Sequence, residues 1–397
     1  MRGNKLRLLV LPVFACLALT VAACGSDDSS SDSSSDGGST PSGPVASASA
    51  NEAFKAVTGL DALDGPATTD ELASRVEDYT AVPEELLIKE PLSKKAEPGK
   101  KLVYILTNVP VLEEFYSALT EAAGEVGYEV ERIEQGATPE EFAQAYQQAS
   151  DMNPDMVIGS GLPREFFNKQ LNELASKGIP VIEWSSGIKP VKDELWTAVD
   201  DPIYEASGIQ MAEYIAHDAD MAANVVSYNV PQYPMPEIWL NTMEQYMNGI
   251  CDDCSFDRQE AALDDIGSLG EKVTAYLQQN PDTKYVLCGF GDLCQGVGQA
   301  LKTAGNDEVQ VITRDQATTN LQNIANGTES AATGLAIGQT GWQIVDLAQR
   351  IFNGDSTDGT RLAPQQIITE VEDPSSDLIG AVPDYKEQYR ELWQLGQ

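Results

Sequence analysis

Few residues in this chain have the types and spacing that catalysis requires. The Gly-Phe-Gly of residues 289–291 follows a predicted strand, as a dinucleotide-binding loop would, but the third glycine of that fingerprint is replaced by Cys294. The Gly-Ser-Gly of residues 159–161 also follows a predicted strand, yet it lacks the spacing of a nucleophile elbow. His217 is the only histidine that a catalytic triad could use. We therefore predict that the protein is not an enzyme and has neither a cofactor nor a metal site.

The first residues direct the chain out of the cytoplasm. Arg2, Lys5 and Arg7 precede a short apolar run that ends in small residues, which is the pattern of a secretory signal. The run is too short for a comfortable membrane span, which needs about 20 apolar residues. The Leu-Thr-Val-Ala-Ala before Cys24 resembles the bacterial lipobox, whose cysteine is acylated. We predict a signal peptide over residues 1–23 and lipidation of Cys24 at the outer face of the cell membrane; signal cleavage that leaves a free Cys24 is the alternative.

Composition separates the next two segments from the remainder. Residues 24–50 are mostly Ser, Asp, Gly and Ala, which bury too little apolar surface to fold, so we expect a disordered tether. Residues 51–100 hold short amphipathic stretches broken by Gly and Pro, and we expect a helical extension. The formal net charge of −37 argues against binding to nucleic acid or to anionic lipid. Contact with the membrane is expected through the lipid anchor.

Four cysteines remain once the signal and the lipid anchor are set aside, and an even number in an oxidising compartment favours disulfide bonds. Three pairings are possible, and the short separations favour Cys251 with Cys254 and Cys288 with Cys294. A redox role for the Cys-Asp-Asp-Cys motif would require a lowered thiol pKa, whereas the two aspartates raise it. Zinc binding is disfavoured because His217 is distant in the sequence.

Strands and helices alternate through the rest of the chain. The first set of predicted strands covers residues 101–108, 128–134, 155–160 and 179–186, with helices at 112–127, 138–152 and 163–178. The second set covers residues 224–230, 284–290, 309–315 and 329–336, with helices at 202–219, 237–250, 268–281, 295–305, 318–327 and 340–354. Strands separated by such helices form parallel sheets covered on both faces. We therefore predict an α/β protein with two doubly wound, Rossmann-like lobes and a ligand site at the carboxyl ends of the strands.

Five stretches occur in an order and at a spacing that match a known family. They are KLVYILTNVP from residue 101, LASKGIPVIEW from residue 174, GFGDLCQGVGQALKTAG from residue 289, VQVITRDQATTNLQNIANG from residue 309 and GQTGWQIVDLAQRIFNGD from residue 338. Together they resemble type I periplasmic binding proteins of the ribose- and galactose-binding group, the substrate receptors of bacterial ABC sugar importers.

The resemblance implies two lobes joined by a multi-strand hinge, which close on a small molecule and present it to a transporter permease. We expect the protein to be a monomer. The first lobe would comprise residues 101–200 plus 338–365, and the second lobe with the tail residues 201–337 plus 366–397. The hinge would cross near residues 199–201, 335–338 and 364–366.

The resemblance also implies ligand-binding positions. Asn108 matches the asparagine of the family's first turn, Asp292 the aspartate at the start of a second-lobe helix, and Asp315 the aspartate after the ninth strand. A carboxylate accepts two hydroxyl hydrogen bonds, which suits it to sugar sites. The structural alternatives are a helix cap for Asp292 and a turn residue for Asp315.

Other positions depart from the sugar-binding pattern but complete the predicted ligand set. Ser160 stands where the family has an asparagine. Ser185 and the serine after it stand where the family has an Asp-Arg pair, and Trp184 precedes these two serines. Trp239 aligns with the arginine that clamps a sugar from the second lobe. Aromatic rings stack on sugar faces, so a carbohydrate is the predicted ligand. The loss of charged and amide groups would also suit an aromatic or alicyclic carboxylate, and a ligand-presenting sensor subunit is a further alternative role.

Five further side chains lie near predicted strand ends. Tyr228, Tyr233 and Phe290 could stack on a sugar ring. Arg164 and Arg314 could receive a carboxylate. The alternatives are lobe core for the aromatic residues and surface ion pairs for the arginines.

Overall fold

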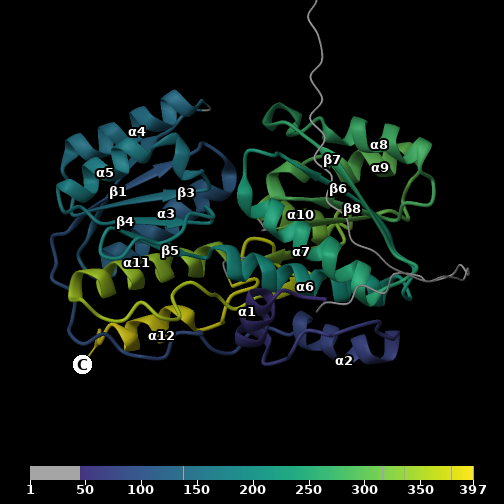
Figure 1. Cartoon of the computed structure of the whole chain (residues 1–397), viewed down its shortest axis with the longest axis horizontal. Coiled ribbons are helices and arrows are strands. Elements are labelled where there is room, and N and C mark those ends of the chain that lie inside the picture. Colours follow the sequence, from purple (N-terminus) through teal and green to yellow (C-terminus); the bar gives the residue numbers. More distant parts are fainter. Residues whose placement is uncertain (1–44, 137, 315–316, 335, 377, 397) are drawn as a thin grey trace, which may run out of the picture. The chain divides into compact units, whose positions relative to one another are not determined.

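Two mainly parallel β-sheets organise the computed structural model (Figure 1). The structure describes residues 45–136, 138–314, 317–334, 336–376 and 378–396. The predicted signal peptide, Cys24 and Asp315 lie outside these residues. The described residues belong to a single compact unit, Gly43–Gln397.

The first sheet has the strand order β2-β1-β3-β4-β5, and all neighbouring strands are parallel. Its strands are β1 (Lys101–Leu106), β2 (Glu129–Glu134), β3 (Met156–Ser160), β4 (Val181–Trp184) and β5 (Leu195–Ala198). Its covering helices are α3 (Pro110–Glu125), α4 (Pro139–Met152), α5 (Asn168–Ser176) and α11 (Ile337–Asn353).

Alternation along β1 divides these helices between the two faces of the sheet. Leu102 and Tyr104 pack into the core that contains α3 and α11. Val103 and Ile105 point the opposite way, into the core that contains α4 and α5. Because both faces are covered, the central strands are apolar at almost every position, which is why they read as continuous runs in the sequence.

The second sheet has the strand order β11-β10-β9-β8-β6-β7, with only the β10–β11 pair antiparallel. Its strands are β6 (Asn224–Asn229), β7 (Ser255–Glu260), β8 (Tyr285–Cys288), β9 (Gln310–Arg314), β10 (Ala331–Gly334) and β11 (Gln366–Ile368). Its helices are α6 (Asp201–Asp218), α7 (Pro234–Ile250), α8 (Leu269–Gln279), α9 (Val297–Ala304) and α10 (Thr318–Ala325). Val225 packs with α6 and α7, whereas Val226 packs with α8 and α9 on the other face.

Strands β5, β7 and β11 are additions to the predicted set. β7 is polar at most positions and lies at one edge of the second sheet, where it is only partly buried. β11 has only three residues and lies at the other edge. Edge strands bury less side-chain surface than central ones, so their sequences carry a weaker hydrophobic signal.

The predicted helical extension packs on the second lobe. It contains α1 (Ala48–Thr58) and α2 (Thr69–Thr80), which both contact α6. The Ser47 side chain caps α1, so residues 48–50, assigned from composition to the tether, are helical. Phe54 is fully buried, which gives the helix an anchor that composition alone did not reveal.

A buried carboxylate joins the extension to α6. Glu213 is fully buried and accepts hydrogen bonds from Arg75 at 2.6 Å and from Tyr79 at 2.6 Å, both on α2. Tyr246 of α7 donates a third hydrogen bond to it at 2.7 Å. A buried charge requires such partners, so α2 completes the folding of the second lobe.

The later part of the extension contacts the first lobe. Arg350 on α11 donates a hydrogen bond to the Glu90 carbonyl oxygen at 2.7 Å, and Asn353 donates one to the Lys94 carbonyl oxygen at 2.8 Å. The Leu92 amide donates to the carbonyl oxygen of Leu392 at 2.9 Å. The extension is therefore bound to both lobes.

The tail divides between the lobes. β11 pairs with β10 of the second sheet, but α12 (Tyr385–Leu392) packs on first-lobe helices. Trp393 stacks on Trp342 of α11 with ring centroids 5.2 Å apart, and Arg390 pairs with Glu125 of α3 at 2.8 Å. The tail helix therefore lies against the first lobe, where its aromatic side chains pack on the apolar surface of α11.

The chain crosses between the lobes after β5, after β10 and before β11. The first and third crossings are joined, because the Val199 amide donates to the Arg361 carbonyl oxygen at 3.1 Å. The guanidinium of Arg361 also pairs with Asp200 at 2.7 Å. These contacts lie close to two of the hinge positions that the family resemblance implies.

Two disulfide bonds hold the second lobe, in the pairing favoured by sequence separation. Cys251 is bonded to Cys254 between α7 and β7, and Cys288 to Cys294 after β8. Among the residues that the structure describes, no group of His, Cys, Asp and Glu could hold a metal ion. No helix in the described part of the chain is long and apolar enough to cross a membrane.

Candidate ligand-binding cleft

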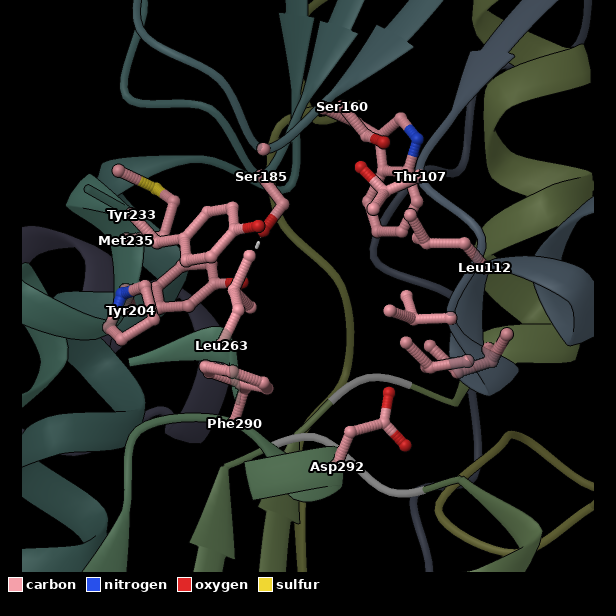
Figure 2. Close-up of a pocket in the computed structure, with 16 residues that line it drawn as sticks. Thr107, Leu112, Ser160, Ser185, Tyr204, Tyr233, Met235, Leu263, Phe290 and Asp292 are labelled. Carbon is pink, nitrogen blue, oxygen red and sulfur yellow. Dashed lines mark hydrogen bonds between the residues drawn. The ribbon is translucent and has the colours of Figure 1, made fainter. Parts of the chain in front are cut away.

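A cleft lies where the carboxyl ends of strands from both sheets meet (Figure 2). Its empty volume is about 790 Å³, including the part open to solvent. The first lobe contributes Thr107, Val109, Val111, Leu112, Ser160, Gly161, Trp184, Ser185 and Ile337, and the second lobe Tyr204, Tyr233, Met235, Pro236, Leu263, Phe290 and Asp292.

Polar groups gather at the first-lobe end of the cleft. Ser160, the last residue of β3, has 6% of its surface exposed, and its hydroxyl has no hydrogen-bond partner among the described atoms. The Thr107 hydroxyl nearby accepts a hydrogen bond from Gln135 at 2.8 Å. The buried Tyr104 phenol lies near Ser160 and Trp184, but none of the three forms a hydrogen bond of good geometry. Ser160 can therefore bond a ligand hydroxyl.

Trp184 is held rigidly at the end of β4. Its ring stacks on Phe115 of α3 with centroids 4.3 Å apart and an angle of 23° between the planes. Only 3% of its surface is exposed. The packing of α3 on the sheet therefore fixes the indole before any ligand arrives.

A hydrogen bond joins the lobes at the floor of the cleft. The hydroxyl of Tyr204, on α6, bonds the hydroxyl of Ser185, which follows β4 (Figure 2). Ser185 has a φ of 53°, a left-handed conformation that is uncommon outside glycine. Buried Arg314 supports Tyr204 from behind, with its guanidinium carbon 4.3 Å from the ring centroid. Tyr204 thus connects the second-lobe strand β9 to a first-lobe strand end.

The loop after β8 places Phe290 and Asp292 in the cleft. The Cys288–Cys294 disulfide closes this loop, which ends in a 3-10 turn at Gly291–Cys294. The Asn320 amide on α10 donates a hydrogen bond to the Gly291 carbonyl oxygen at 3.0 Å. Gln295 donates one to Oδ1 of Asp292 at 3.1 Å, and Asp292 is 3% exposed. The carboxylate is therefore oriented by the loop that carries it.

Four of the predicted ligand residues meet in this cleft: Ser160, Trp184, Ser185 and Asp292. Asn108 is exposed and does not line it, although both of its neighbours do. Asp315 lies outside the described residues.

Trp239, the predicted clamp, is not among the residues that line the cleft. It is fully buried on the face of α7 that packs against α6. Met235 and Pro236, one turn earlier on the same helix, line the cleft in its place. The predicted and the observed contact are thus about one helical turn apart on α7.

Of the five further candidates near predicted strand ends, some line the cleft and others do not. Tyr233 and Phe290 line the cleft, with ring centroids 5.9 Å apart, whereas Tyr228 belongs to the core under α8 and α9. Arg164 lies outside the lining and bonds Asn168 at 2.6 Å. Arg314 contacts Tyr204 and not the cleft itself.

Sequence reasoning missed Tyr204, Leu112 and Ile337. All three lie in the first turns of helices that begin after a strand end, and first turns of this kind face the carboxyl edge of a parallel sheet. This placement is the signal that could have identified them, because their side-chain types alone indicate lobe core.

The described lining contains one carboxyl group, that of Asp292, and no Lys, Arg or His. Its other polar groups are the hydroxyls of Thr, Ser and Tyr side chains and the indole N–H of Trp184. The cleft is therefore suited to a neutral ligand with an extensive apolar surface.

A second buried carboxylate lies close to the cleft but on the opposite face of the sheet. Glu183, just before Trp184, is fully buried and accepts a hydrogen bond from Tyr146 of α4. Burial raises the pKa of Glu183 to about 8, although the bond from Tyr146 lowers it. Glu183 is therefore mostly protonated in the folded protein at neutral pH.

Comparison with known proteins identifies the class to which this fold and cleft belong. A family model described as a periplasmic binding protein domain matches residues 102–356, and the chain belongs to this family. No match is found among functionally curated proteins. Similar solved structures carry the same fold, and three of them follow.

The first is a sugar ABC transporter subunit from Rhodobacter sphaeroides, 18% identical, with a TM-score of 0.60, covering 69% of this chain and 99% of its own. The second is a sugar ABC transporter protein from Yersinia enterocolitica, 18% identical, with a TM-score of 0.63, covering 75% and 96%. The third is a solute-binding protein from Thermotoga lettingae in complex with 5-methylthioribose, 16% identical, with a TM-score of 0.63, covering 77% and 99%.

These findings confirm the type I periplasmic binding protein fold and the family expected from the five sequence stretches. The family is one of substrate-binding proteins that act outside the cytoplasm.

Proposed function

We propose that this protein is a lipid-anchored receptor that captures a small carbohydrate in the cleft and delivers it to an ABC importer. The observation that carries the proposal is the cleft itself, where rigid aromatic rings stand beside a buried hydroxyl and a buried carboxylate. Such a combination stacks on the faces of a sugar ring and bonds its hydroxyls. The names of the similar structures, which are sugar transporter proteins, support the same conclusion.

The lining favours a sugar over a carboxylate ligand. None of the described lining residues carries a positive charge that could pair with an anionic ligand. Burying a carboxylate without such a partner would cost several kcal/mol. An aromatic or alicyclic acid is therefore the weaker candidate.

A thermal-shift panel tests the proposal. A sugar that binds the folded protein at 100 times its Kd stabilises it by about 2.7 kcal/mol, so its Tm should rise. Asp292→Ala should abolish this rise, because a ligand hydroxyl loses its carboxylate partner. A panel in which aromatic acids raise the Tm and sugars do not would contradict the proposal.

The matched control for that variant is Asp307→Ala, which removes a carboxylate from a loop outside the cleft lining. Its Tm response to sugars should equal that of the wild type. Mass spectrometry of compounds that copurify with the protein provides an independent identification of the ligand.

A further inference from the structure

The two long walls of the cleft are apolar. On one side, the connection from β1 into α3 contributes Val109, Val111 and Leu112. On the other side stand Tyr233 and Phe290, and Figure 2 shows Leu112 across the cleft from these rings. A ligand that fills the cleft must therefore present apolar surface in two directions.

Described polar groups that can meet a ligand lie at the two ends and on the floor of the cleft. Ser160 lies at one end in Figure 2, nine-tenths buried, with an unpartnered hydroxyl. Asp292 lies at the other end. The Ser185 and Tyr204 hydroxyls on the floor between them bond each other, and this single bond does not exhaust the hydrogen-bonding capacity of two hydroxyls. Hydrogen bonds to a ligand are thus available at its two ends and along the floor, but not from the aliphatic wall.

This arrangement is unfavourable for a sugar with a hydroxyl on every carbon. A hydroxyl pressed against the aliphatic wall gives up its bonds to water without replacement, at a cost of about 1–3 kcal/mol. An alkyl or aryl group in the same place gains free energy in proportion to the apolar area that it buries.

The charges of the cleft lining also limit which chemical groups a ligand can carry. The described lining offers no cation, so a phosphate or carboxylate substituent would find no positive charge to pair with. The protein as a whole carries a formal net charge of −37, which repels an anionic substituent.

We infer that the ligand is a neutral sugar with an apolar substituent, such as an alkylthio, alkyl or aryl group, which lies between the aliphatic wall and the aromatic rings. The inference rests on the proposed function and specifies the class of sugar. The hydroxyls of the sugar bond Ser160 and Asp292.

Calorimetry with matched ligand pairs tests it. One pair is D-ribose and 5-methylthio-D-ribose, and the other is D-galactose and phenyl β-D-galactopyranoside, with D-galacturonate as the anionic control. In at least one pair, the member with the apolar group should bind at least tenfold more tightly, which corresponds to about 1.4 kcal/mol. D-galacturonate should bind more weakly than D-galactose.

Leu112→Asn should reduce the preference within the pair at least threefold, because it makes the aliphatic wall polar. The matched control is Val82→Asn, since Val82 is 53% exposed and outside the cleft lining. That variant should keep the wild-type preference.

The outcomes separate the inference from the proposed function. If the unsubstituted sugar binds as tightly as its partner in both pairs, or if Leu112→Asn leaves the preference unchanged, the inference is overturned and sugar capture stands. If no sugar of either pair binds, sugar capture fails and the inference fails with it.

Discussion

Replacing Glu183 by glutamine should change how the stability of the protein depends on pH. Burial raises the pKa of Glu183 from 4.5 to about 8 on folding. Between these values the unfolded chain releases a proton that the folded protein keeps, so the free energy of unfolding falls by about 1.4 kcal/mol per pH unit. The contribution is fully present below pH 4.5, and by pH 7 the loss reaches about 3 kcal/mol. Glutamine does not titrate, so Glu183→Gln removes the loss.

Urea denaturation at pH 5, 6, 7 and 8 measures this effect. The stability of Glu183→Gln relative to the wild type should increase by about 1 kcal/mol with each pH unit in this range, because the slope falls below its limit of about 1.4 kcal/mol near either pKa. The control is Glu131→Gln, an exposed carboxylate on β2, which also removes one negative charge. If Glu183→Gln and the wild type lose stability in parallel from pH 5 to pH 8, Glu183 is ionised in the folded protein and the reasoning is wrong.

Three further changes test separate parts of the structure. Replacing Cys288 and Cys294 together by alanine should weaken sugar binding about tenfold in calorimetry, because the loop at the cleft must then be ordered on binding; removal of the other disulfide is the control. Arg75→Met should lower the free energy of unfolding by about 3 kcal/mol in urea denaturation, since it leaves the buried charge of Glu213 without its cation. Cys24→Ala should move the protein from the membrane to the soluble fraction on cell fractionation.

Each of these expectations has a clear contrary result. Unchanged affinity without the Cys288–Cys294 bond would show that the loop keeps its shape through other contacts. Unchanged stability of Arg75→Met would mean that the two tyrosine hydrogen bonds suffice for Glu213. A Cys24→Ala protein that stays with the membrane would contradict the lipid anchor.

The central strands and the helices between them could be predicted because burial on both faces imposes an apolar pattern. Strand β7 escaped prediction because an edge strand needs fewer apolar side chains, and its register is set by pairing with β6. The packing of α12 on α11 also had no local signal. It depends on Trp342 and Trp393, which are far apart in the sequence and whose stacking only the tertiary fold reveals.

The site residues that lie at the ends of strands could be predicted from the sequence. Ser160, Trp184 and Ser185 directly end or follow their strands, so topology alone brings them to the same edge. Trp239 was misplaced along its helix: Met235, one turn earlier on the same side of α7, lines the cleft instead. Tyr204 was missed because its role depends on a partner in the other lobe.

The helical extension shows that the unit which folds is larger than the unit which the family defines. The family match begins at residue 102, yet Arg75 and Tyr79 supply two of the partners of Glu213 inside the second lobe. A protein shortened to residues 102–356 would keep the cleft residues and lose those partners, and would also expose the surface of α6 that α1 and α2 cover. We therefore expect that fragment to aggregate. A stable recombinant form must begin before α1 and α2, which supply the partners of Glu213, and not at the family boundary.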